Sequence, residues 1–207
     1  MFEYRMIHRN GTTVWVKDIV HVVMGDHGPQ KLQGIFVDIT GSKQEHLISK
    51  AVGDLAAALL SETSLEEIAK LTLSRARELT ASEHGYVSAI DQDSGDNISY
   101  TLTQMMGDPC IMRGDDQRIR FPVGKDGKYP GLWGCSLNEK EPMFTNDPSG
   151  HENAKGLPEG HIPLQNFLSA PALYGGELVG QIALANSATD YSEKDLDSVV
   201  RLADIYA

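Results

Sequence analysis

Two cysteines and two loop histidines are the side chains of this sequence most suited to chemistry. Cys110 and Cys135 carry thiols that could act as nucleophiles or soft metal ligands. His151 and His161 could bind a metal or exchange protons. The ten-residue spacing of the histidines does not make a helical ligand pair, and no CxxC motif is present. A zinc site needs further ligands, and none is evident, so we predict no metal site.

The histidine of greatest interest lies in the loop "GLPEGHIPLQNFLSAP", residues 156–171. Its prolines stiffen the chain, its glycines allow unusual backbone angles, and Phe167 begins an apolar run. A loop of this length in a compact domain is usually functional or disordered, and the apolar anchor favours the first. His161 then either lines a pocket as a polar group or simply bonds a nearby backbone group.

Charge and hydropathy exclude several classes of function. The formal net charge is -11, the acidic excess lies after Lys43, and no basic stripe exists, so nucleic acid and anionic membrane surfaces are unsuitable partners. No long uncharged apolar run is present to span a bilayer, and no secretory signal opens the chain. Two cysteines suit a reduced compartment, and we expect a cytoplasmic protein.

The first 41 residues carry three strand patterns. "FEYRMIH" ends at Asn10-Gly11, a strong hairpin signal. "TTVWVKDIVHVVM" ends at the turn "GDHGP", and "KLQGIFVDIT" follows. Apolar side chains occur on both faces of the second and third strands, so both faces of this meander need cover.

This stretch resembles the C-terminal half of a PAS domain. The resemblance rests on "YRMIHRNGTTVWVKDIVHVVMGDHGPQKLQGIFVDITGSKQ", with its Gly-x-x-x-Trp-Val pattern and its final Asp-Ile-Thr. It covers residues 2 to about 44. The strands and helices that form most of a PAS ligand pocket are absent, so we expect a remnant without a pocket of its own.

A linker helix should follow the remnant. Ser42-x-x-Glu45 is a capping box that predicts its start, and Ile48, Ala51, Leu55 and Ala58 follow as a short heptad seam. The seam either packs on its own domain or pairs with a second copy. The PAS resemblance favours the second, so we predict a homodimer through the linker and terminal helices. A second capping box, Ser64-x-x-Glu67, starts the next helix.

The remainder predicts an antiparallel sheet with helices on one side. "GYVSAID" and "NISYTLTQMM" form a hairpin, and a loop-rich stretch runs over residues 107–130. A short helix from about Leu132 and a strand over residues 143–145 come next. "FLSAPALY" and "ELVGQIALAN" flank a Gly-Gly turn, and Ser192 caps a last helix.

Residues 63–206 resemble a GAF domain, most like those of archaeal and bacterial sensor histidine kinases. The motifs are "GLWG", "EPMFTNDP", "GLPEGHIPLQNFLSAP", "GGELVGQIALAN" and "YSEKDLDSVVRLA". The resemblance implies a small-molecule pocket walled by the short helix and the loop after it. We therefore predict an α+β chain with a PAS remnant over residues 1–41, a linker or signalling helix over 42–62 and a GAF domain over 63–207.

We expect the pocket residues to come from the short helix, the strand after it and the loop. They are Trp133, Cys135, Phe144, Asn146, Asp147, His161 and Phe167. Each has a simpler alternative: the aromatic side chains and Cys135 can be core residues, and Asn146 and Asp147 can fix a turn.

The GAF resemblance also raises two other functions. Some GAF domains bind haem, and the candidate haem ligands in this sequence are Cys110, His151 and His161. Others reduce methionine sulfoxide with a thiolate and a resolving cysteine, for which only Cys110 and Cys135 are available. We expect instead a non-enzymatic sensor fragment that binds a small ligand, within a larger protein such as a histidine kinase. No kinase motif is present in the chain.

Overall fold

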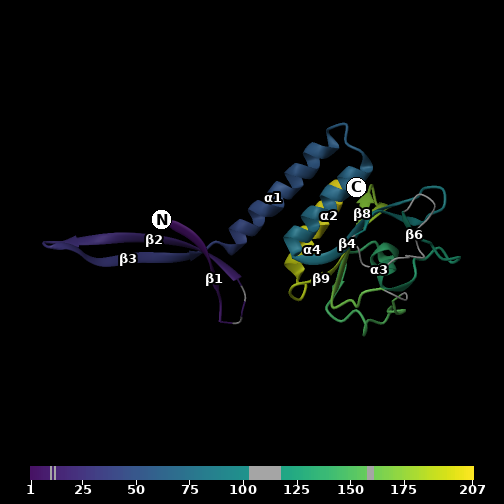
Figure 1. The fold of residues 1–207 in the computed structure, drawn as a ribbon. Helices are drawn as coiled ribbons and strands as arrows, with labels where there is room; N and C mark the ends of the chain where they lie inside the picture. The colour runs from purple at the N-terminus through teal and green to yellow at the C-terminus, as the bar shows by residue number, and fades with distance from the viewer. Residues whose placement is uncertain (10, 12, 103–117, 158–160) are drawn as a thin grey trace. The chain divides into compact units, whose positions relative to one another are not determined.

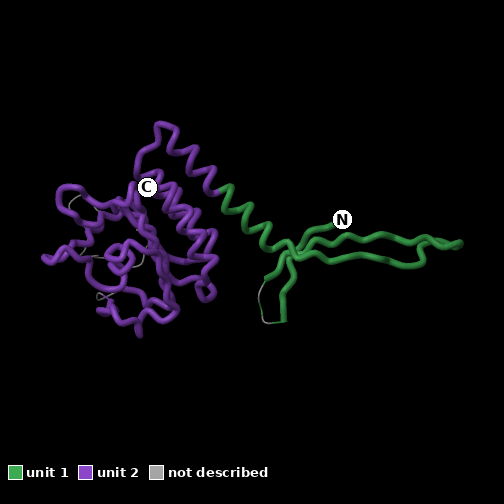
Figure 2. Tube along the Cα trace, turned by 180° about the vertical axis from the view of Figure 1, so that it is seen from behind, with its two compact units in different colours: residues 1–50 green, residues 51–207 purple. Residues whose placement is uncertain are grey.

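The structure is a computed structural model that describes all residues except 10, 12, 103–117 and 158–160. The chain divides into two compact units, Met1–Lys50 and Ala51–Ala207 (Figure 2).

The first unit holds a three-stranded antiparallel sheet in the order β1-β2-β3. The strands are β1 (Phe2–Ile7), β2 (Thr13–Gly25) and β3 (Gly28–Asp38). Gly25 pairs with Gly28, so the second turn lies at Asp26-His27 as predicted. The first turn includes Asn10, which lies outside the described residues.

Apolar side chains of this small sheet are largely exposed. Val16 is buried, but eight apolar side chains of β2 and β3 have at least 38% of their surface exposed, namely Ile19, Val20, Val22, Met24, Leu32, Ile35, Phe36 and Val37. The apolar side chains of these two strands therefore lack the cover that the sequence pattern calls for.

Helix α1 (Thr40–Leu59) begins two residues before the predicted position. The Asp38 carboxylate accepts a hydrogen bond from the N–H of Thr40 at 2.8 Å, so it satisfies a donor of the first turn. The Thr40 hydroxyl accepts another from the N–H of Trp15. The prediction that Ser42 caps this helix is therefore wrong, because Ser42 lies within the first turn.

The second unit is built on a six-stranded antiparallel sheet in the order β6-β5-β4-β9-β8-β7. Its strands are β4 (Ser82–Ile90), β5 (Asn97–Leu102), β6 (Ile119–Phe121), β7 (Met143–Thr145), β8 (Phe167–Tyr174) and β9 (Glu177–Ser187). Strand β6 was not predicted, because its three residues are too short to show a pattern within a loop-rich stretch. The remaining strands lie close to their predicted positions.

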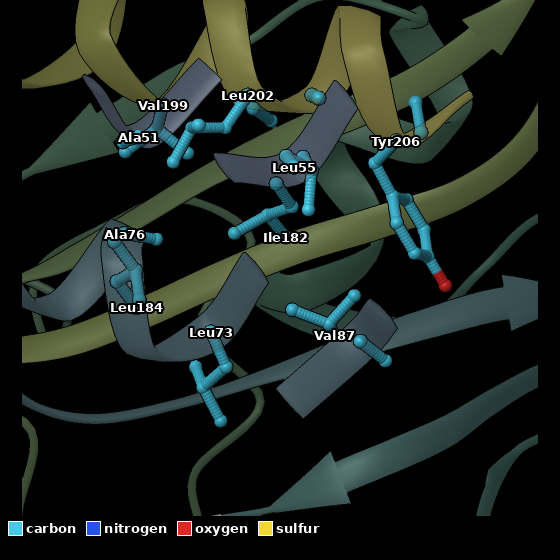
Figure 3. Packing of buried hydrophobic residues seen from close by; sticks show 14 of the residues in the cluster. Ala51, Leu55, Leu73, Ala76, Val87, Ile182, Leu184, Val199, Leu202 and Tyr206 are labelled. Atoms are coloured by element: carbon cyan, nitrogen blue, oxygen red, sulfur yellow. The ribbon is translucent and has the colours of Figure 1, made fainter. Parts of the chain in front are cut away.

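One face of this sheet, the helix face, packs against α2 (Leu65–Thr80) and α4 (Glu193–Tyr206). The two helices lie side by side on that face, whereas α3 (Gly131–Glu139) lies on the other (Figure 1). Side chains alternate along β9, so Ile182 and Leu184 join Val199 and Leu202 of α4 in the core (Figure 3). The fold is therefore α+β, as predicted.

Both helices on this face begin at the predicted caps. Ser64 and Glu67 form a complete capping box at α2, in which the Glu67 carboxylate accepts from the Ser64 N–H at 3.1 Å. Ser192 and Asp195 do the same at α4. These reciprocal bonds satisfy donors that a helix leaves free at its start.

The predicted seam of α1 is already occupied within the chain. Ile48, Ala51 and Leu55 are buried, and Ala51 and Leu55 belong to the core of the second unit (Figure 3). Ala58 packs against the same core. Of the two alternatives, the structure therefore favours packing on the helix's own domain, and a dimer through these side chains would require them to leave that core.

Candidate ligand-binding site

A cavity of about 710 Å³ opens on the face of the sheet opposite α2 and α4. This face, the cavity face, presents Tyr86 of β4, Phe167 of β8, and Ala183 and Ala185 of β9. Register explains their grouping, because Ala183 pairs with Tyr86 and Ala185 pairs with Phe167. The volume lies within the range of ordinary small-molecule sites.

Aromatic side chains form a continuous wall around the base of the cavity. The rings of Tyr86 and Phe121 stack with centroids 5.0 Å apart and planes 22° apart. The Phe121 ring also lies 5.0 Å from that of Trp133, which in turn meets the Tyr129 ring edge-on at 5.7 Å. Such contacts add stability beyond area burial and hold each ring in a defined orientation.

The side chain of Gln181 holds this aromatic wall in place through hydrogen bonds beneath the cavity. Its side chain is fully buried, and its Oε1 accepts hydrogen bonds from the Tyr86 hydroxyl at 2.9 Å and from Nδ2 of Asn97 at 2.8 Å. Its Nε2 donates to the backbone carbonyl of Trp133 at 2.8 Å and to Ser169 Oγ at 2.7 Å. One amide therefore joins β4, β5, β8, β9 and α3 beneath the cavity.

Helix α3 is held close to the preceding loop. Gly134 must lack a side chain, since a Cβ atom there would collide with the backbone carbonyl of Tyr129. The Asn138 side chain accepts from the N–H of Tyr129 and donates to its carbonyl, both at 2.8 Å. The Tyr129 hydroxyl donates to the carbonyl of Gly95. These bonds position Trp133 against the aromatic wall.

The polar lining comes from the long connection between β7 and β8. Its polar side chains are those of Ser149, Lys155 and His161. The same connection also contributes two apolar side chains, Leu157 and Leu164. Lys155 and Leu157 are exposed, so they stand at the mouth, whereas the sheet residues form a buried floor. Residues on both sides of the undescribed 158–160 thus line the cavity.

His161 is half-buried, and its Nδ1 lies 2.6 Å from the backbone carbonyl of Ile162. A carbonyl can only accept, so this bond places the proton on Nδ1. The other ring nitrogen, Nε2, then keeps its lone pair in the neutral ring. Both predicted roles of His161 are therefore present at once: the ring bonds a backbone group and lines the cavity.

The seven predicted pocket residues divide into two sets. Trp133, His161 and Phe167 line the cavity. Phe144 pairs with Leu168 on β8 and packs on the helix face, so it lies on the wrong side of the sheet.

Asn146 and Asp147 serve the turn after β7 instead of the cavity. The Asn146 side chain forms two hydrogen bonds with the backbone of Tyr191, at 2.8 and 3.0 Å. The Asp147 carboxylate accepts from Ser149 and from the N–H of Gly150, each at 3.0 Å. Asp147 therefore fixes its own turn, which is its predicted alternative role, whereas Asn146 ties this turn to the segment that precedes α4.

The candidate thiols and histidines are not assembled into one centre in the described structure. Cys135 lies on α3 outside the cavity lining, and its thiol is 3.6 Å from the carbonyl of Gly131. Burial raises the pKa of the Cys135 thiol, which opposes thiolate formation. His151 accepts a hydrogen bond from the N–H of Asn153 in its own turn. Cys110 lies outside the described residues, and the described residues hold no cluster of three or more metal-binding side chains.

Many lining residues were missed from the sequence, among them Tyr86, Phe121 and Lys155. Tyr86 lies on a predicted strand, and its alternation with buried Val87 was the available signal. Phe121 lies on the unpredicted strand β6, and Lys155 lies in a loop where nothing in the pattern marks a ligand contact.

Comparison with known proteins places this arrangement in a family. Residues 62–207 match the GAF domain family, which is more than half of the chain. The chain belongs to the GAF domain family. The cavity therefore lies in the GAF domain, between its sheet, its helix α3 and the connection from β7 to β8.

A curated relative extends the similarity to the whole chain. The methyl sulfide methyltransferase-associated sensor of Methanosarcina acetivorans is 25% identical over 98% of this chain. The chain spans about one fifth (20%) of the length of that relative.

Solved structures show the same GAF fold. The GAF domain of a phosphoenolpyruvate-protein phosphotransferase from Coxiella burnetii is 21% identical, with a TM-score of 0.61 over 78% of this chain and 90% of its own. The free methionine-R-sulfoxide reductase of Neisseria meningitidis is 13% identical, with a TM-score of 0.58 over 77% and 85%. At these identities the likeness concerns the fold alone.

Helix length and hydropathy give one further result. Among the described residues, no helix combines the length and the apolar character that crossing a bilayer requires.

Proposed function

We propose that this chain is a non-catalytic sensory fragment whose GAF domain binds a small molecule in the cavity. The observation that carries the proposal is the cavity itself: about 710 Å³, an apolar floor on a rigid sheet, and few polar groups near its mouth. Such a combination is typical of ligand sites. The similarity to a protein named as a sensor, across both units, supports it.

The proposed mechanism is a population shift. A ligand that binds between the sheet and the β7–β8 connection favours the conformation in which the connection contacts the ligand. The cavity floor and the helix core are opposite faces of the same strands, since Ala183 and Ala185 alternate with Ile182 and Leu184 on β9. Strand β9 therefore offers a direct route from the ligand to α4.

We also propose that residues 1–41 are the end of a PAS domain and that the fragment belongs to a larger cytoplasmic sensor such as a histidine kinase. The support is the order of a three-stranded meander, a helix and a GAF domain. A dimer would then use surfaces other than the α1 seam, such as the one around Leu60, which directly follows α1 and is 91% exposed.

The experiment uses the neutral fluorescent probe N-phenyl-1-naphthylamine. Trp133 lines the cavity, and Trp15 lies in the first unit, so a Trp15→Phe background leaves Trp133 as the energy donor. Binding in the cavity should produce energy transfer from Trp133 to the probe. Ala185→Phe fills the floor and should abolish the transfer, with Leu164→Phe as a second filling variant. Transfer that persists in both folded variants would place the probe elsewhere and contradict the proposal.

Haem is a second candidate because of one observation. His161 lines the cavity, and its bond to the Ile162 carbonyl leaves Nε2 with a lone pair that could hold a haem iron. Haem would supply redox or gas-binding chemistry, and His161 would hold it. For this candidate, we expect the Soret band of haemin to shift when the protein is added. This shift should be lost in His161→Ala but not in His151→Ala.

A further inference from the structure

The distribution of charge in the cavity indicates which ligands it suits. The chain has 29 acidic and 18 basic residues, yet no acidic residue is among the described residues that line the cavity. Lys155 is the only lysine or arginine among them, and His161 is the only histidine. In a protein with this acidic excess, a set of twenty residues would ordinarily include carboxylates, so the described lining differs in charge from the rest of the chain.

The basic side chains and the serine of the described lining come from one segment of the chain. Ser149, Lys155 and His161 all come from the β7–β8 connection, whereas the floor consists of aromatic side chains and alanines. The polar atom nearest the floor, the Tyr86 hydroxyl, already donates to Gln181. A ligand would therefore place apolar atoms on the floor and its polar group toward the connection.

The shape of the apolar part follows from the wall. Tyr86, Phe121 and Trp133 are locked by ring contacts at 5.0 Å, and the carbonyl of Trp133 is tied to Gln181. Rigid rings of this kind favour flat partners that stack or meet them edge-on. Alanines at positions 183 and 185 leave room for such a flat group above β9.

Resting on the proposed sensory function, we propose that the cavity takes a flat, largely apolar organic anion whose acidic group lies at the mouth. Lys155 attracts the anion there. His161 adds a hydrogen bond through Nε2, which donates when the ring is protonated and accepts from a protonated acid or hydroxyl when it is neutral. A cationic ligand would meet Lys155 with no carboxylate of the described lining to balance it.

A matched pair of probes tests the sign of the charge. 1-Anilinonaphthalene-8-sulfonate and N-phenyl-1-naphthylamine share one ring system and differ in the sulfonate. Energy transfer from Trp133 in the full-length Trp15→Phe protein reports each affinity, and only the transfer that Ala185→Phe abolishes is assigned to the cavity. We expect the sulfonate to bind more tightly at low ionic strength, and salt to reduce this difference.

Variants then assign the effect to named side chains. Lys155→Gln should weaken sulfonate binding about two- to fivefold, as for a partly exposed ion pair, and leave the neutral probe unchanged. Lys125→Gln removes an exposed lysine outside the lining and should change neither affinity. His161→Gln serves as a second lining variant if Lys155→Gln fails to fold.

The possible failures are distinguishable. If the neutral probe binds as tightly as the sulfonate, or if Lys155→Gln weakens both probes equally, the anion proposal is overturned and the sensory function stands. If neither probe gives transfer that the filled cavity abolishes, both proposals fail together.

Discussion

The hydroxyl of Tyr86 donates a hydrogen bond to Oε1 of Gln181 at 2.9 Å, which links an aromatic wall of the cavity to the polar centre of the sheet. Burial raises the pKa of Tyr86, so the hydroxyl keeps its proton and remains a donor. The cavity is thus shaped by a buried network whose own polar atoms do not face a ligand.

Replacing Gln181 with Ala should lower the free energy of unfolding by about 2–4 kcal/mol, because several buried partners lose their bonds at once. Those partners include the Tyr86 hydroxyl and the Asn97 amide. Urea unfolding followed by circular dichroism measures the change. Gln165→Ala, at an exposed position of the same unit, should change stability by less than about 0.5 kcal/mol. Equal effects of the two variants would refute the network's role.

Replacing Leu55 with Lys should unfold or strongly destabilise the second unit, by roughly 3 kcal/mol or more, since Leu55 is fully buried in its core. Leu60→Lys, at a residue that is 91% exposed, should leave stability nearly unchanged. Calorimetry measures the stability of each variant, and sedimentation measures whether it is a monomer or a dimer. A stably folded Leu55→Lys monomer derived from a wild-type dimer would restore the seam interpretation.

Removing residues 1–41 should leave a cooperatively folding GAF domain, because the core of the second unit draws on α1 only from Ala51 onward. Removing residues 1–61 should reduce its stability markedly, since Ala51 and Leu55 are lost from that core. Thermal unfolding of both truncations tests the boundary. Loss of cooperative unfolding in the shorter truncation would contradict the separation into two units.

Replacing His161 with Ala should change the free energy of unfolding by about 1 kcal/mol or less, as for a half-buried loop residue. Binding of 1-anilinonaphthalene-8-sulfonate should weaken, because a polar lining group is lost. His151→Ala is the matched loop control and should bind the probe as the wild type does. Severe unfolding of His161→Ala would instead indicate a structural histidine.

Acid should weaken the start of α2 through Glu67. Hydrogen bonds from the Ser64 side chain and backbone hold the pKa of Glu67 below its ordinary value. The resulting stabilisation is present above the ordinary pKa of a glutamate and is lost as pH falls through the lowered value. Urea midpoints at pH 7 and pH 3 should therefore differ less in Glu67→Gln than in the wild type. Glu62→Gln, before the helix, should keep the wild-type difference.

Much of the fold could be derived from local patterns. Ser64 with Glu67, and Ser192 before α4, marked helix starts because capping depends on residues within one turn. Gly175-Gly176 marked the hairpin between β8 and β9, because a two-residue turn of this kind needs positive φ angles. Trp133 and Phe167, which the resemblance to the GAF family placed at the pocket, line the cavity.

What the sequence by itself determined, then, was the type and order of the elements other than β6, since caps, turns and alternation act over a few residues. Only the tertiary structure decided which face each element buries. Phe144 and Phe167 are equally apolar, yet strand register places Phe144 on the helix face of the sheet and Phe167 on the cavity face. The same holds for Leu55, which was expected to pair with a second copy but is buried in its own core. Faces of strands and helices are chosen by partners far apart in the sequence, and local patterns do not encode those partners.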